Sequence, residues 1–154
     1  MSKKEHQGSD APLNDYEVKD IISKFKEKYQ MQKYQVPIHY SFRAEIRFKR
    51  NVQKHGIVVL TPHYVGLFGP KKNKEKGCEL LEKGLISILN IHQVYFRANV
   101  FACLMLDDQC QDKAILKSPR STRFAQLLYR NYRFSFDGKK SDKDIDDFFK
   151  SDSK

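Results

Sequence analysis

Residues 38–49 alternate between apolar and polar side chains, and this pattern constrains the fold more than any other part of the sequence. Successive side chains of a β-strand point to opposite faces, so a period of two predicts a long strand with one buried face. The apolar positions are Ile38, Tyr40, Phe42, Ala44, Ile46 and Phe48. A half-buried strand of this length needs partner strands in an antiparallel sheet.

Short apolar runs separated by turn-forming residues follow this first strand. A polar turn is expected over residues 50–55, and a lysine-rich loop over residues 71–76. The apolar runs predict a β-meander whose further strands cover residues 56–61, 64–68, 78–81 with a continuation at 85–88, 93–97, 100–106 and 114–116.

A helix is predicted before the first strand. Asn14 and Glu17 have the spacing of a capping box, and apolar residues recur behind them at helical intervals, which predicts a helix over about residues 15–33. Pro37 prevents the helix from continuing. The apolar stripe of this helix either packs on the sheet or pairs with a second copy of the chain or a partner helix.

A second helix is predicted after the last strand. Ser118 and Pro119 form a strong start signal, because serine can accept from free first-turn amides and proline loses no hydrogen bond at the first helical position. The helix should run to residue 132 or 134 and close an apolar opening of the sheet.

The 154 residues correspond to about one domain, and their formal net charge is +10. Most of this charge lies in residues 39–76, where nine Lys and Arg against two Glu give +7. A focused basic surface attracts anionic partners such as lipid, nucleic acid or acidic protein faces.

The sequence also argues against several classes of protein. No apolar run approaches the roughly 20 residues of a membrane-spanning helix, and the polar N-terminus lacks the apolar core of a signal peptide, so we expect a cytoplasmic protein. Three cysteines without a C-x-x-C pair argue against a disulfide framework or a zinc ribbon. We found no catalytic motif, and we expect no enzymatic activity, no metal and no cofactor.

Seven short antiparallel strands followed by one helix is the element order of the pleckstrin-homology superfold. Residues 56–68 (GIVVLTPHYVGLF) resemble the second and third strands of pleckstrin-homology-like and GRAM-like modules. Residues 86–94 resemble a later I-x-x-I-x-x-V phrase, and residues 119–132 resemble the closing helix. The resemblance covers residues 36–134, and it is strongest to the divergent module at the N-terminus of CARMIL-type leucine-rich-repeat proteins.

The resemblance implies a mainly β, α+β fold. It implies a seven-stranded antiparallel barrel or sandwich, capped by a C-terminal helix and preceded here by an extra N-terminal helix. The tail would be a linker to leucine-rich repeats within a cytoskeletal or signalling adaptor. We therefore expect a disordered leader, an amphipathic helix, the pleckstrin-homology-like domain and a flexible polar tail or linker over residues 1–13, 14–35, 36–136 and 137–154.

Phosphoinositide-binding members of this family carry a Lys at the end of the first strand and a basic-x-Arg pair in the second. Lys49 and Arg50 match the first position, but residues 56–61 contain no Lys or Arg, which argues against a selective head-group site. Nonselective attraction to anionic lipid remains, weakened by the acidic turn at residues 107–112. The candidate lipid-binding residues are Lys49, Arg50, Lys54, Lys71, Lys72, Lys74 and Lys76.

Our first hypothesis is therefore a divergent pleckstrin-homology-like module that attaches weakly to anionic membranes as a peripheral protein. The alternative is a protein-interaction or dimerisation domain, which would use a strand edge or a groove beside the last helix near Arg120, Arg123 and Arg130. Nonspecific nucleic-acid binding by the basic block is a third hypothesis, but nucleic acid is not the partner we expect. The same lysines would also keep a protein without any of these partners soluble.

Overall fold

The computed structural model describes residues 12–29, 38–72, 76–107, 109 and 111–132. These residues form seven β-strands, two α-helices and one short 3-10 helix. In chain order the elements are α1 (Asp15–Tyr29), β1 (Tyr40–Phe48), β2 (Asn51–Leu60), β3 (Tyr64–Pro70), β4 (Cys78–Ser87), η1 (Ile88–Asn90), β5 (Gln93–Arg97), β6 (Phe101–Met105), β7 (Lys113–Lys117) and α2 (Ser121–Tyr132). The predicted order of elements is confirmed.

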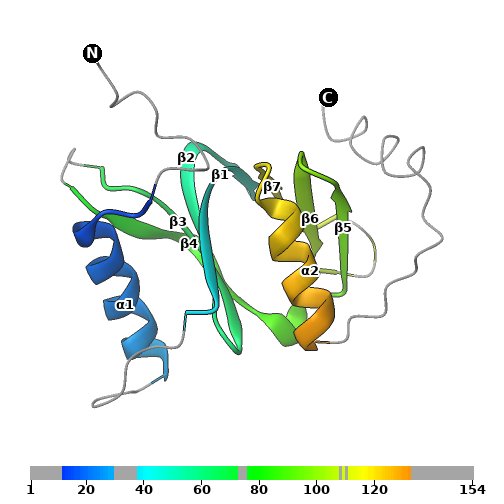
Figure 1. The fold of residues 1–154 in the computed structure, drawn as a ribbon, viewed down its shortest axis with the longest axis horizontal. Coiled ribbons are helices and arrows are strands. Elements are labelled where there is room, and N and C mark those ends of the chain that lie inside the picture. Colours follow the sequence, from blue (N-terminus) through cyan, green and yellow to red (C-terminus); the bar gives the residue numbers. More distant parts are fainter. Residues whose placement is uncertain (1–11, 30–37, 73–75, 108, 110, 133–154) are drawn as a thin grey trace.

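The strands form one antiparallel sheet in the order β4-β3-β2-β1-β7-β6-β5, so β4 and β5 are its two edge strands. Strand β1 joins the two halves because it pairs with β2 on one side and with β7 on the other. Figure 1 shows α1 and α2 on opposite sides of β1 and β2. The fold is therefore mainly β, with a seven-stranded sheet and a helix at each end of the described chain.

Strand β2 begins earlier than the sequence predicts. Residues 50–55 were expected to form a loop, but β2 starts at Asn51, which pairs with Phe48 across a tight turn. Lys49 has a positive φ of 57° in this turn. Residues 51–55 lack the alternation of apolar and polar side chains that marks a half-buried strand, because this end of β2 is not covered. Lys54 therefore lies on a strand and not in a loop.

Helix α2 begins two residues later than predicted, at Ser121. The carbonyl of Ser118 accepts a hydrogen bond from the Ser121 amide at 3.1 Å, and the Ser118 hydroxyl accepts one from the Arg120 amide at 3.0 Å. These bonds close a turn before the helix, and Pro119 lies inside that turn, where its fixed φ is also suitable.

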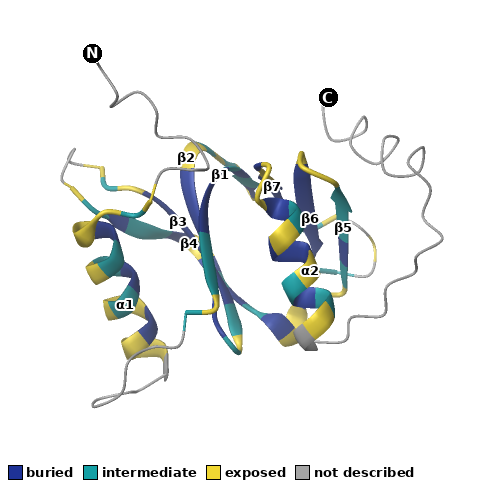
Figure 2. Ribbon diagram, viewed as in Figure 1, coloured by how far each residue is buried: buried dark blue, intermediate teal, exposed yellow. Residues whose placement is uncertain are grey.

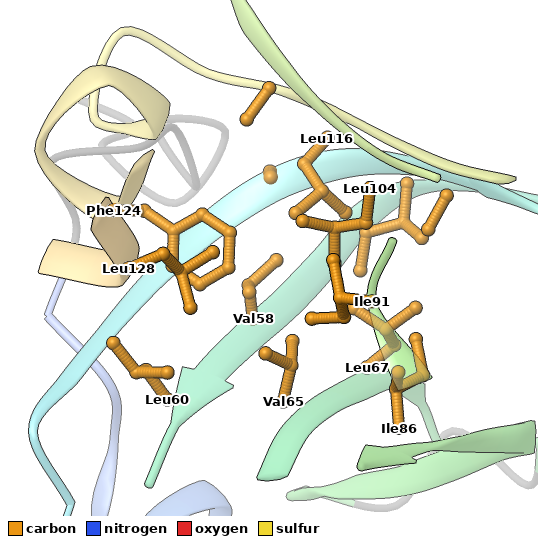
Figure 3. Close-up of a cluster of buried hydrophobic side chains, with 14 of the residues drawn as sticks. Val58, Leu60, Val65, Leu67, Ile86, Ile91, Leu104, Leu116, Phe124 and Leu128 are labelled. Carbon is orange, nitrogen blue, oxygen red and sulfur yellow. The ribbon is translucent and has the colours of Figure 1, made fainter. Parts of the chain in front are cut away.

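The main core lies inside the curved sheet, under α2. The apolar positions of the alternating strand point into it, and Phe42, Ala44, Ile46 and Phe48 are all buried, as predicted. Phe124 closes the core from α2, with its ring centroid 5.5 Å from that of Phe42. Figure 3 shows side chains from both halves of the sheet meeting the α2 residues Phe124 and Leu128.

Helix α1 covers the opposite face of β2, β3 and β4. Its residues Ile21 and Phe25 are fully buried against Ile57, Val59 and Phe68. Burying an apolar side chain of this size contributes about 1.5–3 kcal/mol, so α1 belongs to the packed structure. Of the two alternatives left open by the sequence, packing of α1 on the sheet is the one observed.

The N-terminus of α1 has the predicted capping box. The Glu17 amide donates to the Asn14 side chain at 2.8 Å, and the Asn14 amide donates to the Glu17 carboxylate at 2.9 Å. The same carboxylate also accepts two hydrogen bonds from Arg43 of β1, at 2.6 and 3.0 Å. Arg43 is only 5% exposed, although the alternation of β1 predicts that it faces solvent. A buried ion pair therefore joins α1 to the sheet.

Candidate functional site

The β1–β2 turn and the beginning of β7 form a basic cleft of about 270 Å³, which we call the turn cleft. Antiparallel pairing places Arg47 of β1 opposite Ile115 of β7, so the turn lies beside the end of the β6–β7 connection. The turn cleft is lined by Arg47, Lys49, Arg50, Asn51, Val52, Gln111, Asp112, Lys113 and Ile115. Four of these nine residues are basic and one is acidic, so the cleft can attract anions.

One ion pair occupies the rim of the turn cleft. The Lys49 ammonium lies 2.9 and 3.0 Å from the two Asp112 carboxylate oxygens, and both side chains are 37% exposed. Exposed pairs of this kind are worth at most about 1 kcal/mol, so this one can open when a stronger anion competes for Lys49. The pair confirms that an acidic residue of the 107–112 turn reduces the local positive field.

The other basic residues of the turn cleft differ in how they are held. The Arg47 guanidinium lies 3.3 Å from Glu45 on the same strand. Arg50 is exposed and has no ion-pair partner among the described residues. Val52 stands next to them with 56% of its surface exposed, which adds an apolar side chain to a basic rim. The turn cleft thus presents charge together with an apolar contact.

A second cleft of about 310 Å³ lies on the other side of the Lys49–Asp112 pair. It separates the edge strand β4 and η1 from the end of β6. Its lining residues are Phe48, Lys49, Lys83, Leu85, Ile86, Ser87, Leu89, Asn90, His92, Leu106 and Asp112. Its basic residues are Lys49, Lys83 and His92, and its other lining residues are mostly apolar or uncharged. This cleft is therefore less basic than the turn cleft.

Two of the lysines predicted in the β3–β4 loop, Lys71 and Lys76, contact α1. Lys71 lies 3.3 Å from the Asp20 carboxylate, and the Lys76 ammonium lies 5.4 Å from the centre of the Tyr16 ring. Lys72 is exposed, and Lys74 lies outside the described residues. Of these, the three described lysines do not line the turn cleft. Among the described members of the predicted set, the structure therefore brings together only Lys49 and Arg50, and it adds Arg47 and Lys113.

Arg47 and Lys113 were missed because sequence reasoning assigned the basic surface to loops. Both residues lie on strands, and their proximity depends on the pairing of β1 with β7, which are separated by most of the domain. The only signal for Arg47 was its position on the polar side of the alternating strand. Lys113 had no such signal, because a single lysine is common at the start of a short apolar strand.

The groove between α2 and the sheet is filled by side chains of the protein itself. Phe124, Ala125 and Leu128 are fully buried there. The Tyr129 hydroxyl donates a hydrogen bond to the carbonyl of Val94 on the edge strand β5. Burial raises the pKa of this hydroxyl, and the nearby Tyr95 raises it further, so Tyr129 stays a donor. The predicted groove residues Arg120, Arg123 and Arg130 lie exposed around this filled groove.

Cys78, at the start of β4, is buried under α1. Its thiol lies 3.6 Å from the Glu17 carbonyl, and its amide donates to the Asp20 carboxylate at 3.1 Å. Burial, and secondarily the charges of Glu17 and Asp20, raises the pKa of the thiol to about 12. The thiol is therefore protonated at neutral pH and unreactive.

The raised pKa of Cys78 predicts a specific loss of stability in alkaline solution. An unfolded thiol titrates near pH 8.5, so the bound proton stabilises the folded state fully below that pH and progressively less as the pH rises toward about 12. Urea unfolding from about pH 9 to about pH 11 should show a steeper decline for the native protein than for Cys78→Ala, by up to about 1.4 kcal/mol per pH unit. Parallel curves for the two proteins would contradict this assignment.

No protein-family model matches the sequence, and no curated protein matches it. Within the described parts of the chain, no helix has both the length and the apolar character needed to cross a membrane. The geometry of the clefts is therefore the observation on which a function can be proposed.

Proposed function

We propose that this chain is a divergent pleckstrin-homology-like module that attaches weakly to anionic membrane surfaces through the turn cleft. The observation that supports this proposal is that one cleft is lined by four basic residues, Arg47, Lys49, Arg50 and Lys113. Near an anionic leaflet each Lys or Arg contributes about 1 kcal/mol, so a few such residues give weak, salt-dependent attachment. Exposed Val52 would add apolar contact with the lipid interface.

The order of strands and helices supports the family part of this proposal. A seven-stranded antiparallel sheet followed by a buried C-terminal helix is the arrangement that the sequence resemblance implies. Strand β2 includes Lys54, which could be the first residue of a basic-x-Arg pair. The second position of that pair would be residue 56, which is glycine and not arginine. With one cation on β2, we propose attraction to negative surface charge and no selection of one head group.

A peptide-binding role for the α2 groove has less support. An incoming strand would need the outward carbonyls of β5, and the Val94 carbonyl is already bound by Tyr129. Pairing through α1 also has less support, because its Ile21 and Phe25 are buried on the sheet of the same chain.

Charge reversal in the turn cleft tests the proposal. We expect the triple variant Arg47→Glu, Arg50→Glu, Lys113→Glu to lose at least about 3 kcal/mol of affinity for vesicles of phosphatidylcholine and phosphatidylserine, which is roughly 100-fold or more. Vesicle co-sedimentation, repeated at rising salt, measures this. The matched control is Lys19→Glu, Lys24→Glu, Lys26→Glu, which makes the same charge change on the exposed face of α1.

The Lys49–Asp112 pair provides a variant with the opposite effect. Asp112→Asn removes a negative charge from the rim and releases Lys49, so it should increase vesicle binding about fivefold. Equal losses in the cleft variant and the α1 control would mean that net charge alone governs binding. If vesicle binding by the native protein changed with neither salt nor phosphatidylserine content, the proposal as a whole would be contradicted.

A further inference from the structure

The edge strand β4 contains a wide bulge beside the second cleft. Its pairing with β3 shifts between Gly66 and Phe68, so that Leu67 alone lies opposite the four β4 residues 81–84. In this bulge Lys83 has a positive φ of 56°, a backbone conformation that glycine adopts more readily than residues with a Cβ atom. Bulges at sheet edges often redirect a side chain, and here Lys83 lines the second cleft. We call this cleft the bulge cleft.

The fold itself does not explain a lysine in the bulge. Gly84, the next residue, is needed for packing, because an added Cβ would lie 2.7 Å from the Leu67 carbonyl oxygen. The Lys83 side chain, in contrast, is exposed and has no ion-pair partner among the described residues. Glycine at position 83 would relieve the backbone strain at little cost in packing. What Lys83 contributes is therefore an ammonium group at the cleft.

Groups that can donate hydrogen bonds to an anion surround the bulge cleft. They are the ammonium groups of Lys49 and Lys83, the side-chain amide of Asn90 and the imidazole of His92. Asp112 is the single acidic residue among the described residues that line it, and Lys49 binds both of its oxygens. Phosphate groups are held best by several charge-assisted hydrogen bonds, which donors from separate segments can provide from different directions. The cleft volume of about 310 Å³ is within the range of small-ligand sites.

An exposed leucine stands at the rim of the bulge cleft. Leu89 of η1 is 95% exposed, whereas Ile88 and Ile91 are buried and fix the turn through a hydrogen bond from the Ile91 amide to the Ile88 carbonyl. Figure 2 shows buried residues along the strands and exposed residues at turns and on the outer faces of the helices. Apolar surface in such a place is stabilised only when a partner removes it from water. Leu89 thus adds an apolar contact to a cationic cleft.

The two features together favour a lipid over a soluble anion. A soluble anion would engage the cations of the bulge cleft and leave Leu89 in water. A phospholipid offers its phosphate at the surface of the leaflet and its acyl chains directly below, so it can meet both. The bulge cleft also shares Lys49 and Asp112 with the turn cleft, where exposed Val52 gives the same combination of charge and apolar contact. The two clefts therefore adjoin and can face one membrane.

We propose that the bulge cleft binds the phosphate group of an anionic phospholipid, with Lys83 as its main cation and Leu89 inserted into the apolar part of the leaflet. The inference rests on the membrane attachment proposed above and adds to it a second contact site with a defined apolar anchor. It requires no selection of one head group, because phosphate is common to all phospholipids.

An introduced tryptophan tests the insertion of Leu89, because the native sequence contains no tryptophan. In Leu89→Trp, the emission should shift to shorter wavelength on addition of phosphatidylcholine–phosphatidylserine vesicles, and lipids with brominated acyl chains should quench it. The matched control is Val100→Trp. Val100 is 47% exposed in the turn between β5 and β6, at the opposite end of this hairpin from His92. The tryptophan of the control should stay in water, with its emission neither shifted nor quenched.

Replacing Lys83 with glycine tests the phosphate contact without damage to the fold. Lys83→Gly should be at least as stable as the native protein in thermal unfolding, because glycine suits the positive φ. Its affinity for the same vesicles should nevertheless fall about fivefold. Lys72→Gly removes the same charge from the exposed β3–β4 loop, outside both clefts, and should have a much smaller effect. Lys83→Gln, which keeps most of the side chain, should lose as much affinity as Lys83→Gly.

The results separate this inference from the proposed function. If Leu89→Trp sedimented with vesicles but its emission were neither shifted nor quenched, the inference would be overturned and attachment through the turn cleft would stand. Equal losses in Lys83→Gly and Lys72→Gly would also overturn it, because net charge alone would then explain both. If inorganic phosphate without vesicles produced the full emission shift of Leu89→Trp, the ligand would be a soluble anion and the lipid assignment would be wrong. A native protein that failed to sediment with vesicles at low salt would contradict the proposed function itself.

Discussion

Replacing Glu17 with glutamine is expected to destabilise the protein by about 3 kcal/mol, and replacing it with alanine by up to about 5 kcal/mol. Glutamine keeps the shape and can still complete the capping box, so its effect isolates the lost charge. The loss is large because Arg43 would remain buried without a counter-ion. Urea unfolding followed by circular dichroism measures the change.

Two comparisons make the Glu17 result specific. Asp112→Asn breaks the exposed pair with Lys49 and should cost less than about 1 kcal/mol. Adding Arg43→Met to Glu17→Gln should recover much of the lost stability, because replacing both members of a buried pair is far less costly than removing one. A loss below about 1 kcal/mol for Glu17→Gln, with no recovery in the double variant, would show that the pair does not hold α1 to the sheet.

The second large effect is expected at the contact between α1 and β3. Phe25→Ala should cost about 3–5 kcal/mol, because Phe25 is fully buried and its ring centroid lies 6.1 Å from that of Phe68. Gly66 of β3 lies directly beneath this ring, where an added Cβ would come within 2.8 Å of the Phe25 side chain. Gly66→Ala alone should therefore also destabilise the protein, by roughly 1–3 kcal/mol.

The double variant tests whether these two residues really touch. Gly66→Ala should cost less when Phe25 is already alanine, because the added methyl group then enters the space that the ring has left. Thermal unfolding of the four proteins gives the coupling energy between the two positions. Strictly additive effects would show that α1 does not pack on β3 in this way. A dimer that dissociates on Phe25→Ala would instead show that α1 pairs with another copy.

The sequence was sufficient to predict the elements whose signals are local. The alternation of residues 38–49 gave β1 and its buried face, and the Asn14–Glu17 spacing gave the start of α1. Each of these signals depends on neighbours within a few positions, for which backbone geometry alone decides which side chains meet.

The features that escaped prediction depend on contacts between distant segments. Arg43 was assigned to a solvent-facing side because alternation cannot show that α1 covers this side as well. The first residues of β2 were predicted to form a loop, because a strand end without a buried face shows no alternation of apolar and polar residues. The turn cleft needs β1 beside β7, and Arg47 and Lys113 carry no sign of that pairing in the sequence. Pairing between distant strands is a property of the whole fold.

The electrostatic balance of the turn cleft has a further implication for regulation. In the membrane attachment that we propose, an anionic group that engages Lys49 has to displace the Asp112 carboxylate. The cost of this exchange is small at an exposed pair. The proposed attachment would therefore be weak at surfaces of low charge density and stronger where several anionic groups compete for the turn cleft at the same time.

The contact of α1 with β4 also affects how the chain folds during synthesis. Residues 15–29 are synthesised before the strands that they cover, and the last of these strands, β4, ends at residue 87. At about 5–20 residues per second, roughly 3–12 s pass between the synthesis of α1 and the completion of its site on the sheet. During this interval the side chains of Ile21 and Phe25 lack the complete sheet that buries them in the folded protein. Helix α1 is thus synthesised before the sheet that it covers is complete, and until then the nascent chain presents an amphipathic helix that chaperones can bind.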